Sequence, residues 1–167
     1  MTQRVDLSTV MDRIAIDSLI TGYAVAVDDA AWADYEALFT AGGRADYRTA
    51  GGIEGTAAEV AGWLAGTMRL FPVRQHLIVN RRLRLPTRDG EAGDTAELQA
   101  DYVNPMRLGG ADGPDGTGGA GAPPEANFFS GGRYAFGLSR TEDGWRLREV
   151  VVHEKWRHVA PGVSARS

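Results

Sequence analysis

Histidine is the most versatile acid–base residue type in this chain, which has three histidines and no cysteine. His76 lies in a segment that alternates like a strand, and its imidazole could act as a general base near neutral pH. The same pattern is typical of a hydrogen-bonded core histidine, so His76 alone leaves both interpretations open. His153 and His158 flank Glu154, but the H-E-x-x-H spacing and a helix are lacking, so we expect no metal site. The absence of cysteine excludes thiolate chemistry and disulfides.

One glycine-rich segment matches a nucleotide-binding pattern literally. Residues 116–121 read Gly-Thr-Gly-Gly-Ala-Gly, which fits G-x-G-x-x-G. A dinucleotide site needs a strand before this motif and a helix after it, whereas Pro114 precedes it and Pro123 and Pro124 follow. We therefore predict a flexible Gly/Pro-rich loop at about residues 109–126. The sequence contains no G-x-S-x-G nucleophile elbow.

Length and composition are those of one ordinary folded domain. The chain has 167 residues, of which 43% are hydrophobic and 24% charged, and we assign residues 1–167 to a single domain. Its formal net charge of -4 argues against a nucleic-acid partner. No apolar run approaches the ~18 residues of a membrane span, and residues 1–10 do not resemble a secretory signal. We expect a cytoplasmic protein with no membrane partner.

Helical periodicity dominates the first seventy residues. A long amphipathic helix is expected to end at Asp28, and a short helix should follow over residues 32–39. Residues 44–48 are expected to form a short strand. Thr56 and Glu59 have the spacing of a capping box, which predicts the start of a third helix.

The remainder of the chain alternates like strands, over residues 73–85, 95–108, 127–141 and 145–157. Helices segregated from a mostly antiparallel sheet indicate the α+β class. Strict alternation in the first strand would place Arg82 and Arg84 on the same face as His76, unless a bulge near Asn80 and Arg81 shifts the register. The arginine-rich stretch is otherwise typical of a solvated sheet edge. On the opposite face we expect an apolar stripe that a homodimer or homotrimer would cover, formed by Leu77, Val79, Leu83 and Leu85.

Several of these residues together resemble a known family. They are Tyr23, Asp28, Trp32, Phe39, the run Arg44-Ala45-Asp46-Tyr47-Arg48, Arg74-Gln75-His76, Asn80 and the ending from Gly144-Trp145-Arg146-Leu147 through Trp156. The set is similar to the SnoaL-like branch of the nuclear transport factor 2-like (NTF2-like) superfamily, whose members include scytalone dehydratase and bile acid 7α-dehydratase. The resemblance implies a cone-shaped, cystatin-like α+β barrel with three N-terminal helices packed in a curved, mostly antiparallel sheet.

The resemblance also implies a set of catalytic residues and no cofactor. Asp28 and His76 correspond to the acid–base dyad, with Tyr23 one helical turn before the aspartate. Tyr47 corresponds to a tyrosine that helps hold a water, and Asp101 is the best match to a further pocket aspartate. The second histidine of scytalone dehydratase has no counterpart in residues 102–106, which argues against scytalone as the substrate. The implied activity is a cofactor-independent dehydratase for a hydrophobic polycyclic or polyketide-like molecule.

The expected pocket walls are Trp63, Met68, Phe71, Ile78, Asn80, Phe129, Arg133 and Trp156. If Arg82 or Arg133 faces the pocket, an acidic substrate is favoured. Two other functions share the scaffold: an isomerase of the ketosteroid type or a polyketide cyclase, and a non-catalytic binding or structural subunit. A hydrogen-bonded Asp28–His76 pair that opens on a cavity would favour the enzymes. A separated pair beside a filled interior would favour the non-catalytic alternative.

Overall fold

A computed structural model describes residues 6–88, 91–109 and 126–160. Its helices are α1 (Leu7–Asp28), α2 (Trp32–Ala37) and α3 (Ala57–Thr67), with short 3-10 helices η1 (Arg48–Ala50) and η2 (Met68–Leu70). Its strands are β1 (Phe39–Asp46), β2 (Glu54–Thr56), β3 (Val73–Arg74), β4 (Leu77–Arg84), β5 (Thr87–Arg88), β6 (Glu91–Ala92), β7 (Thr95–Arg107), β8 (Phe128–Thr141) and β9 (Gly144–Val159). Most of the loop predicted at about residues 109–126 lies outside the described residues.

Seven strands form one curved sheet in the order β2-β1-β9-β8-β7-β3, with β4 also paired to β7. The α+β prediction is confirmed, with one correction. The sheet is mostly antiparallel, as predicted, and is mixed only through β1, which runs parallel to β9. The three helices are not all N-terminal, because α3 follows β1 and β2 in the chain.

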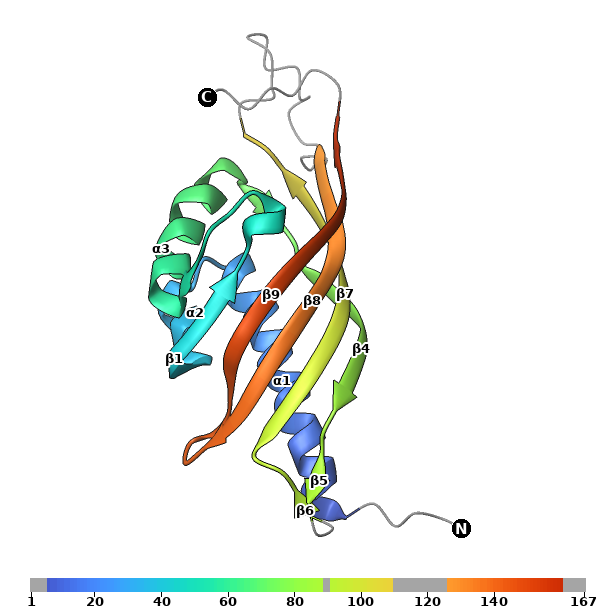
Figure 1. Ribbon diagram of the computed structural model, residues 1–167. Coiled ribbons are helices and arrows are strands. Elements are labelled where there is room, and N and C mark those ends of the chain that lie inside the picture. Colours follow the sequence, from blue (N-terminus) through green and yellow to red (C-terminus); the bar gives the residue numbers. More distant parts are fainter. Residues whose placement is uncertain (1–5, 89–90, 110–125, 161–167) are drawn as a thin grey trace, which may run out of the picture.

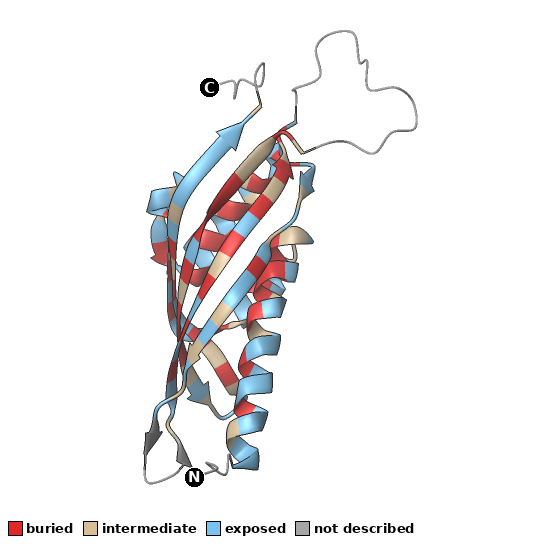
Figure 2. Cartoon of the chain, turned by 90° about the vertical axis from the view of Figure 1, so that its right-hand side faces the viewer, coloured by how far each residue is buried: buried red, intermediate tan, exposed pale blue. Residues whose placement is uncertain are grey.

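The helices cover one face of the sheet, and the long strands β7, β8 and β9 sweep across them (Figure 1). Alternation along β7 is regular, with Ala96, Leu98, Ala100, Tyr102, Asn104 and Met106 all buried. Figure 2 shows the resulting bands of buried residues on the sheet, facing the buried side of α1. The predicted capping box is confirmed, since the Thr56 hydroxyl accepts from Glu59 N and the Glu59 carboxylate accepts from Thr56 N.

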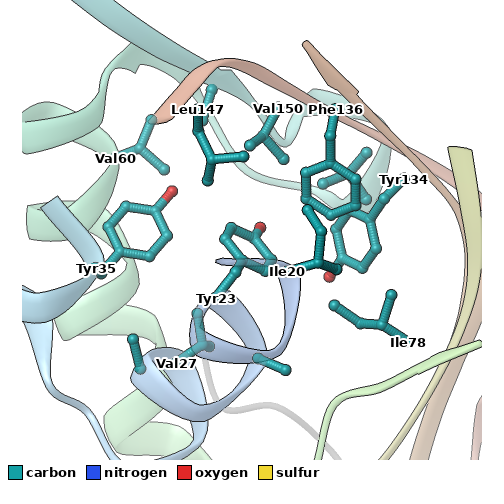
Figure 3. Close-up of a cluster of buried hydrophobic side chains, with 14 of the residues drawn as sticks. Ile20, Tyr23, Val27, Tyr35, Val60, Ile78, Tyr134, Phe136, Leu147 and Val150 are labelled. Carbon is teal, nitrogen blue, oxygen red and sulfur yellow. The ribbon is translucent and has the colours of Figure 1, made fainter. Parts of the chain in front are cut away.

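Tyrosines form a large part of the core. All five tyrosines of the chain are buried, namely Tyr23, Tyr35, Tyr47, Tyr102 and Tyr134. Tyr23 makes edge-on contacts with Tyr134 and Phe136, at ring-centroid distances of 5.6 and 5.4 Å. Figure 3 shows this cluster between α1 and the sheet. No helix in the described ranges is long and apolar enough to cross a membrane.

The bulge considered for β4 is present. Asn80 has a positive φ of 51°, and the pairing of β4 with β7 shifts register between Val79 and Arg82. The extra residue turns Arg82 and Arg84 outward, where both are exposed, while Leu83 packs against the core. The predicted stripe is therefore split: Leu77 and Val79 face solvent, but Leu83 and Leu85 do not share their face.

The N-terminal half of α1 is bound to the sheet through a buried carboxylate. Asp12 is 8% exposed. It accepts two hydrogen bonds from the Arg140 guanidinium, at 2.8 and 2.7 Å, and one from the Trp145 indole at 2.9 Å. The Arg140 hydrogen bonds lower the pKa of this carboxyl, and their effect outweighs burial, which raises it. This anchor fixes α1 across the β8–β9 hairpin.

Candidate active site

The site begins where α1 ends, because the C-terminus of that helix is clamped by Arg74. The Arg74 Nε donates to the carbonyl oxygens of Val27 and Asp28, at 3.2 and 2.8 Å. Its Nη1 donates to the carbonyls of Met68 and Phe71, at 3.0 and 3.1 Å. The last carbonyls of a helix lack partners within the helix, and a cation there is favourable. Arg74 thereby fixes Asp28 next to the segment that carries His76.

Asp28 and His76 form a two-point contact. The imidazole Nδ1 lies 2.6 Å from Asp28 Oδ1, and the backbone N–H of His76 donates to Asp28 Oδ2 at 3.0 Å. Because a carboxylate can only accept, the ring must carry its hydrogen on Nδ1. The Nε2 lone pair is then free on the other side of the ring. The His76 side chain is 7% exposed and that of Asp28 is 21% exposed.

His76 lines a cavity of about 280 Å³ between the helices and the inner face of the sheet. Apolar side chains form most of its wall, contributed by Trp63, Leu64, Met68, Leu70, Phe71, Met106, Leu108, Phe128 and Val152. Polar atoms come from Tyr47, Tyr102, Asn104, Ser130, Tyr134, Glu154 and Arg157. A mostly apolar cavity with a few converging polar groups is the usual form of a small-molecule site.

Two tyrosines connect the cavity to the core below it. Tyr47 lines the cavity, and its hydroxyl is hydrogen-bonded to that of Tyr23, which lies beneath it on α1. Burial raises the pKa of both phenols well above the ordinary value. Both therefore stay protonated at neutral pH, and Tyr47 can act as a hydrogen-bond donor.

Residues 8–151 match the family model of the SnoaL-like domain. The chain belongs to the SnoaL-like domain family. It is 30% identical over 141 residues to the uncharacterized protein Rv2910c of Mycobacterium tuberculosis, covering 84% of each chain. This family lies in the NTF2-like superfamily, as the sequence resemblance predicts.

Solved structures of other proteins share the SnoaL-like fold. The dehydrochlorinase LinA-type3 of Novosphingobium barchaimii superposes with a TM-score of 0.69 at 15% identity, covering 97% of this chain and 99% of the other. A Novosphingobium aromaticivorans protein, named only provisionally as a scytalone dehydratase, gives 0.65 at 13%, covering 95% and 98%. Kfla4162 of Kribbella flavida gives 0.69 at 21%, covering 89% and 94%. At these identities the likeness concerns the fold.

Asp101 lies away from the SnoaL-like cavity, contrary to the expectation that it is a pocket aspartate. It occupies the outer face of β7, because its neighbours Ala100 and Tyr102 point inward. There its carboxylate accepts from Arg133 at 2.9 Å and from Lys155 at 3.4 Å. The Arg133 hydrogen bond lowers the pKa of Asp101 and is the largest of several effects. Asp101 is part of a surface charge cluster.

The expected wall residues divide into two groups. Trp63, Met68 and Phe71 line the cavity. Ile78 lies in the adjoining core, and the others lie on the outer side of the sheet. Asn80 and Arg133 contact Asp101 there, the Phe129 ring lies 6.3 Å from that of His158, and Trp156 is 47% exposed over Gly131. Neither Arg82 nor Arg133 faces the cavity, so the acidic-substrate argument based on them fails.

A polar wall opposite the apolar one was missed by sequence reasoning. Strand register pairs Asn104 with Ser130 and Ser130 with Arg157. The pairings of Arg74 with Met106 and Leu77 with Val103 place His76 beside Asn104 in the same row. We call Tyr102, Asn104, Ser130 and Glu154 the acceptor wall. Alternation along residues 96–106 could have identified Tyr102 and Asn104, and alternation from Val150 through Val152 could have identified Glu154.

Proposed function

We propose that this protein is a cofactor-independent lyase that removes water from a small hydrophobic molecule, with His76 as the general base. The observation that carries the proposal is the Asp28–His76 contact of 2.6 Å beside a largely apolar cavity. Asp28 fixes the tautomer in which Nε2 is unprotonated, and it stabilises the imidazolium that forms when Nε2 takes a proton.

The reaction begins with removal of a proton from a carbon next to a carbonyl group. His76 Nε2 takes the proton, and the electron pair of the C–H bond moves into an enolate. A hydrogen-bond donor in a cavity of low dielectric constant stabilises the developing oxyanion. We assign this donor to Tyr47, which lines the cavity and whose hydroxyl lies between those of Tyr23 and Tyr35. Its hydrogen can turn to the substrate only when Tyr23 donates to the Tyr47 oxygen.

The enolate then collapses with loss of the β-hydroxyl. Its electron pair forms a carbon–carbon double bond as the carbon–oxygen bond breaks. The proton held on His76 passes to the departing oxygen, which leaves as water, and the imidazole returns to its starting state. One base can thus complete the cycle, since it becomes the acid of the second step.

The fold likeness is compatible with elimination chemistry. Hexachlorocyclohexane dehydrochlorinase removes hydrogen and chloride, and scytalone dehydratase is named for the removal of water. The cavity of about 280 Å³ lies near the lower end of small-molecule sites, so we propose substrates of one or two rings. Reactions of the ketosteroid-isomerase or polyketide-cyclase type would begin with the same proton removal, but their products would form without loss of water.

The test is a screen of cyclic β-hydroxyketones, with mass spectrometry to detect the loss of one water. For any substrate found, His76→Gln is expected to reduce turnover about 10²–10⁴-fold, the usual contribution of a general base. His153→Gln is the matched control, since His153 is exposed on the other side of the sheet. A reduction below ~10-fold in His76→Gln would refute the assignment of the base. A product of unchanged mass would leave His76 as the base but would show that the reaction is an isomerisation and not a dehydration.

A further inference from the structure

The acceptor wall contains hydrogen-bonding groups that the proposed chemistry at His76 does not use. Glu154 is central to it: its Oε2 accepts from Ser130 Oγ at 2.9 Å and from Arg157 Nη2 at 2.8 Å. Within the described ranges every donor to this carboxylate reaches Oε2, and none reaches Oε1. Glu154 therefore keeps acceptor capacity at the edge of the cavity.

Hydrogen-bond direction determines what the neighbouring hydroxyls can offer. Ser130 has a single hydroxyl hydrogen, and it points to Glu154. The Tyr102 hydroxyl lies 3.4 Å from Ser130 Oγ, so Tyr102 must be the donor of that pair. Both hydroxyl hydrogens are engaged within the protein, and what remains for a ligand is oxygen lone pairs.

Asn104 adds a further acceptor next to His76. Its side chain lines the cavity and is 5% exposed, its amide interacts with the Tyr134 hydroxyl, and its Oδ1 has no donor among the described residues. Buried side-chain oxygens almost always have a partner. Because this oxygen is fully enclosed, a ligand hydroxyl would reach it only if the amide turned toward the cavity.

The cation beside this wall, Arg157, uses two of its three guanidinium nitrogens in contacts within the protein. Arg157 donates through Nε and Nη2 to Glu154 and through Nη2 to the Ala50 carbonyl, and it lies over the Phe128 ring. A ligand carboxylate approaching Arg157 would meet the Glu154 carboxylate at the same place. The wall is thus suited to neutral hydrogen-bond donors and poorly suited to anions.

From this geometry we infer that the cavity selects neutral ligands that carry a hydroxyl group, which donates to the acceptor wall. Carboxylates and donor-free molecules such as chlorinated hydrocarbons are disfavoured. The inference deepens the proposed function and partly rests on it, because it defines the substrate class for the same cavity. It concerns binding, however, and can be tested without turnover.

The experiment measures the dissociation constants of 2-naphthol, 2-chloronaphthalene and 2-naphthoate by NMR titration of the wild-type protein. These three probes share one ring system and have no β-hydroxyketone, so none can undergo the proposed elimination. We expect 2-naphthol to bind about 10-fold more tightly than 2-chloronaphthalene, from one or two added hydrogen bonds, and more tightly than 2-naphthoate. Equal binding of the naphthol and the chloro compound, or tightest binding of the carboxylate, would overturn the inference.

Two cavity variants test which residues accept the hydrogen bond from the naphthol hydroxyl group. Asn104→Leu keeps the approximate shape without the acceptor, and Glu154→Gln replaces the carboxylate by an amide. Each is expected to reduce the naphthol preference about 3- to 10-fold. Glu149→Gln, an exposed position on the same strand, is the matched control and should leave the preference unchanged. A preference that survives both cavity variants would place the hydroxyl elsewhere and refute the role of this wall.

The outcomes also separate the two proposals. A hydroxyl preference without any dehydration dependent on His76 would keep the ligand class and make the protein a binding protein. Dehydration dependent on His76 without that preference would keep the lyase and discard the ligand class.

Discussion

Replacing Asp28 by asparagine should reverse the tautomer of His76. In the wild type one carboxylate oxygen faces Nδ1 at 2.6 Å, and the other accepts from the His76 backbone N–H at 3.0 Å. An asparagine has one oxygen and one NH₂ group for these two positions. If its oxygen takes the backbone N–H, its NH₂ faces Nδ1, and the ring hydrogen must move to Nε2.

The alternative orientation of the amide is less favourable. It would keep the hydrogen on Nδ1, but the NH₂ group would then face the backbone N–H, and two donors would oppose each other. Leaving a buried donor without an acceptor costs about 1–3 kcal/mol. That cost corresponds to a preference of roughly 5- to 150-fold for the reversed tautomer. His76 would then present a hydrogen to the cavity where the mechanism needs a lone pair.

The tautomer can be read directly from long-range ¹H–¹⁵N correlation spectra of the imidazole rings at a pH where they are neutral. The chain has three histidines, so the spectra are simple to assign. We expect an Nδ1–H ring for His76 in the wild type and an Nε2–H ring in Asp28→Asn. Asp29→Asn removes the same charge at the adjacent exposed position and should leave the wild-type pattern. An unchanged His76 tautomer in Asp28→Asn would refute the reasoning about the pair.

The same change should lower turnover of any substrate about 10²–10⁴-fold, because a base in the wrong tautomer cannot accept the proton. Tyr47→Phe should lower the maximal rate more than substrate affinity, which steady-state kinetics would show, because it removes the proposed oxyanion donor. Asp12→Asn should lower the free energy of unfolding at pH 7 by about 2 kcal/mol in urea titrations, since it weakens the buried contact with Arg140. Arg140 lowers the pKa of Asp12 in the folded state. The stabilisation from this contact is therefore fully present above the unfolded-state pKa of about 3.9 and is lost as the pH falls through the folded-state pKa. The difference in unfolding free energy between variant and wild type should shrink below about pH 4. We also propose a homodimer or homotrimer that covers the outward face of Leu77 and Val79, and light scattering that finds a monomer at micromolar concentration would contradict it.

The sequence predicted the helices and strands better than it predicted which face of the sheet each side chain occupies. The helices and the capping box at Thr56 follow from local periodicity and were expected at nearly their observed positions. The split of the apolar stripe results from the bulge at Asn80, whose positive φ alternation does not encode. The sequence suggested this bulge only through the awkward placement of Arg82.

Asp101 shows how a resemblance can override better local evidence. The residues Ala100, Tyr102, Asn104 and Met106 alternate with it, so a period of two already places Asp101 on the opposite face. The resemblance suggested a pocket aspartate at this position, and the structure follows the alternation. The polar residues that do face the cavity on this strand are Tyr102 and Asn104.

Arg157 could not have been found by alternation alone, whereas Ser130 continues the buried row of Tyr134 and Phe136, and Glu154 continues that of Val150 and Val152. The pairing of β8 with β9 shifts register between Gly131 and Gly132, and Lys155 is the extra residue. A side chain at Gly132 would collide with the His153 carbonyl oxygen, at 2.1 Å from its Cβ, so the strands can approach this closely only because the residue is glycine. The bulge at Lys155 brings Arg157 onto the same face as Glu154.

The two halves of the candidate site therefore have separate structural origins. The base is fixed by the end of α1, the clamp of Arg74 and the two bonds from His76 to Asp28. The acceptor wall is fixed by the register of β7, β8 and β9. A substitution in the wall can change which ligand binds without moving the base, and a change at Asp28 can disable the base without altering the wall. This separation is the physical reason that binding selectivity and proton transfer can be measured independently in this protein.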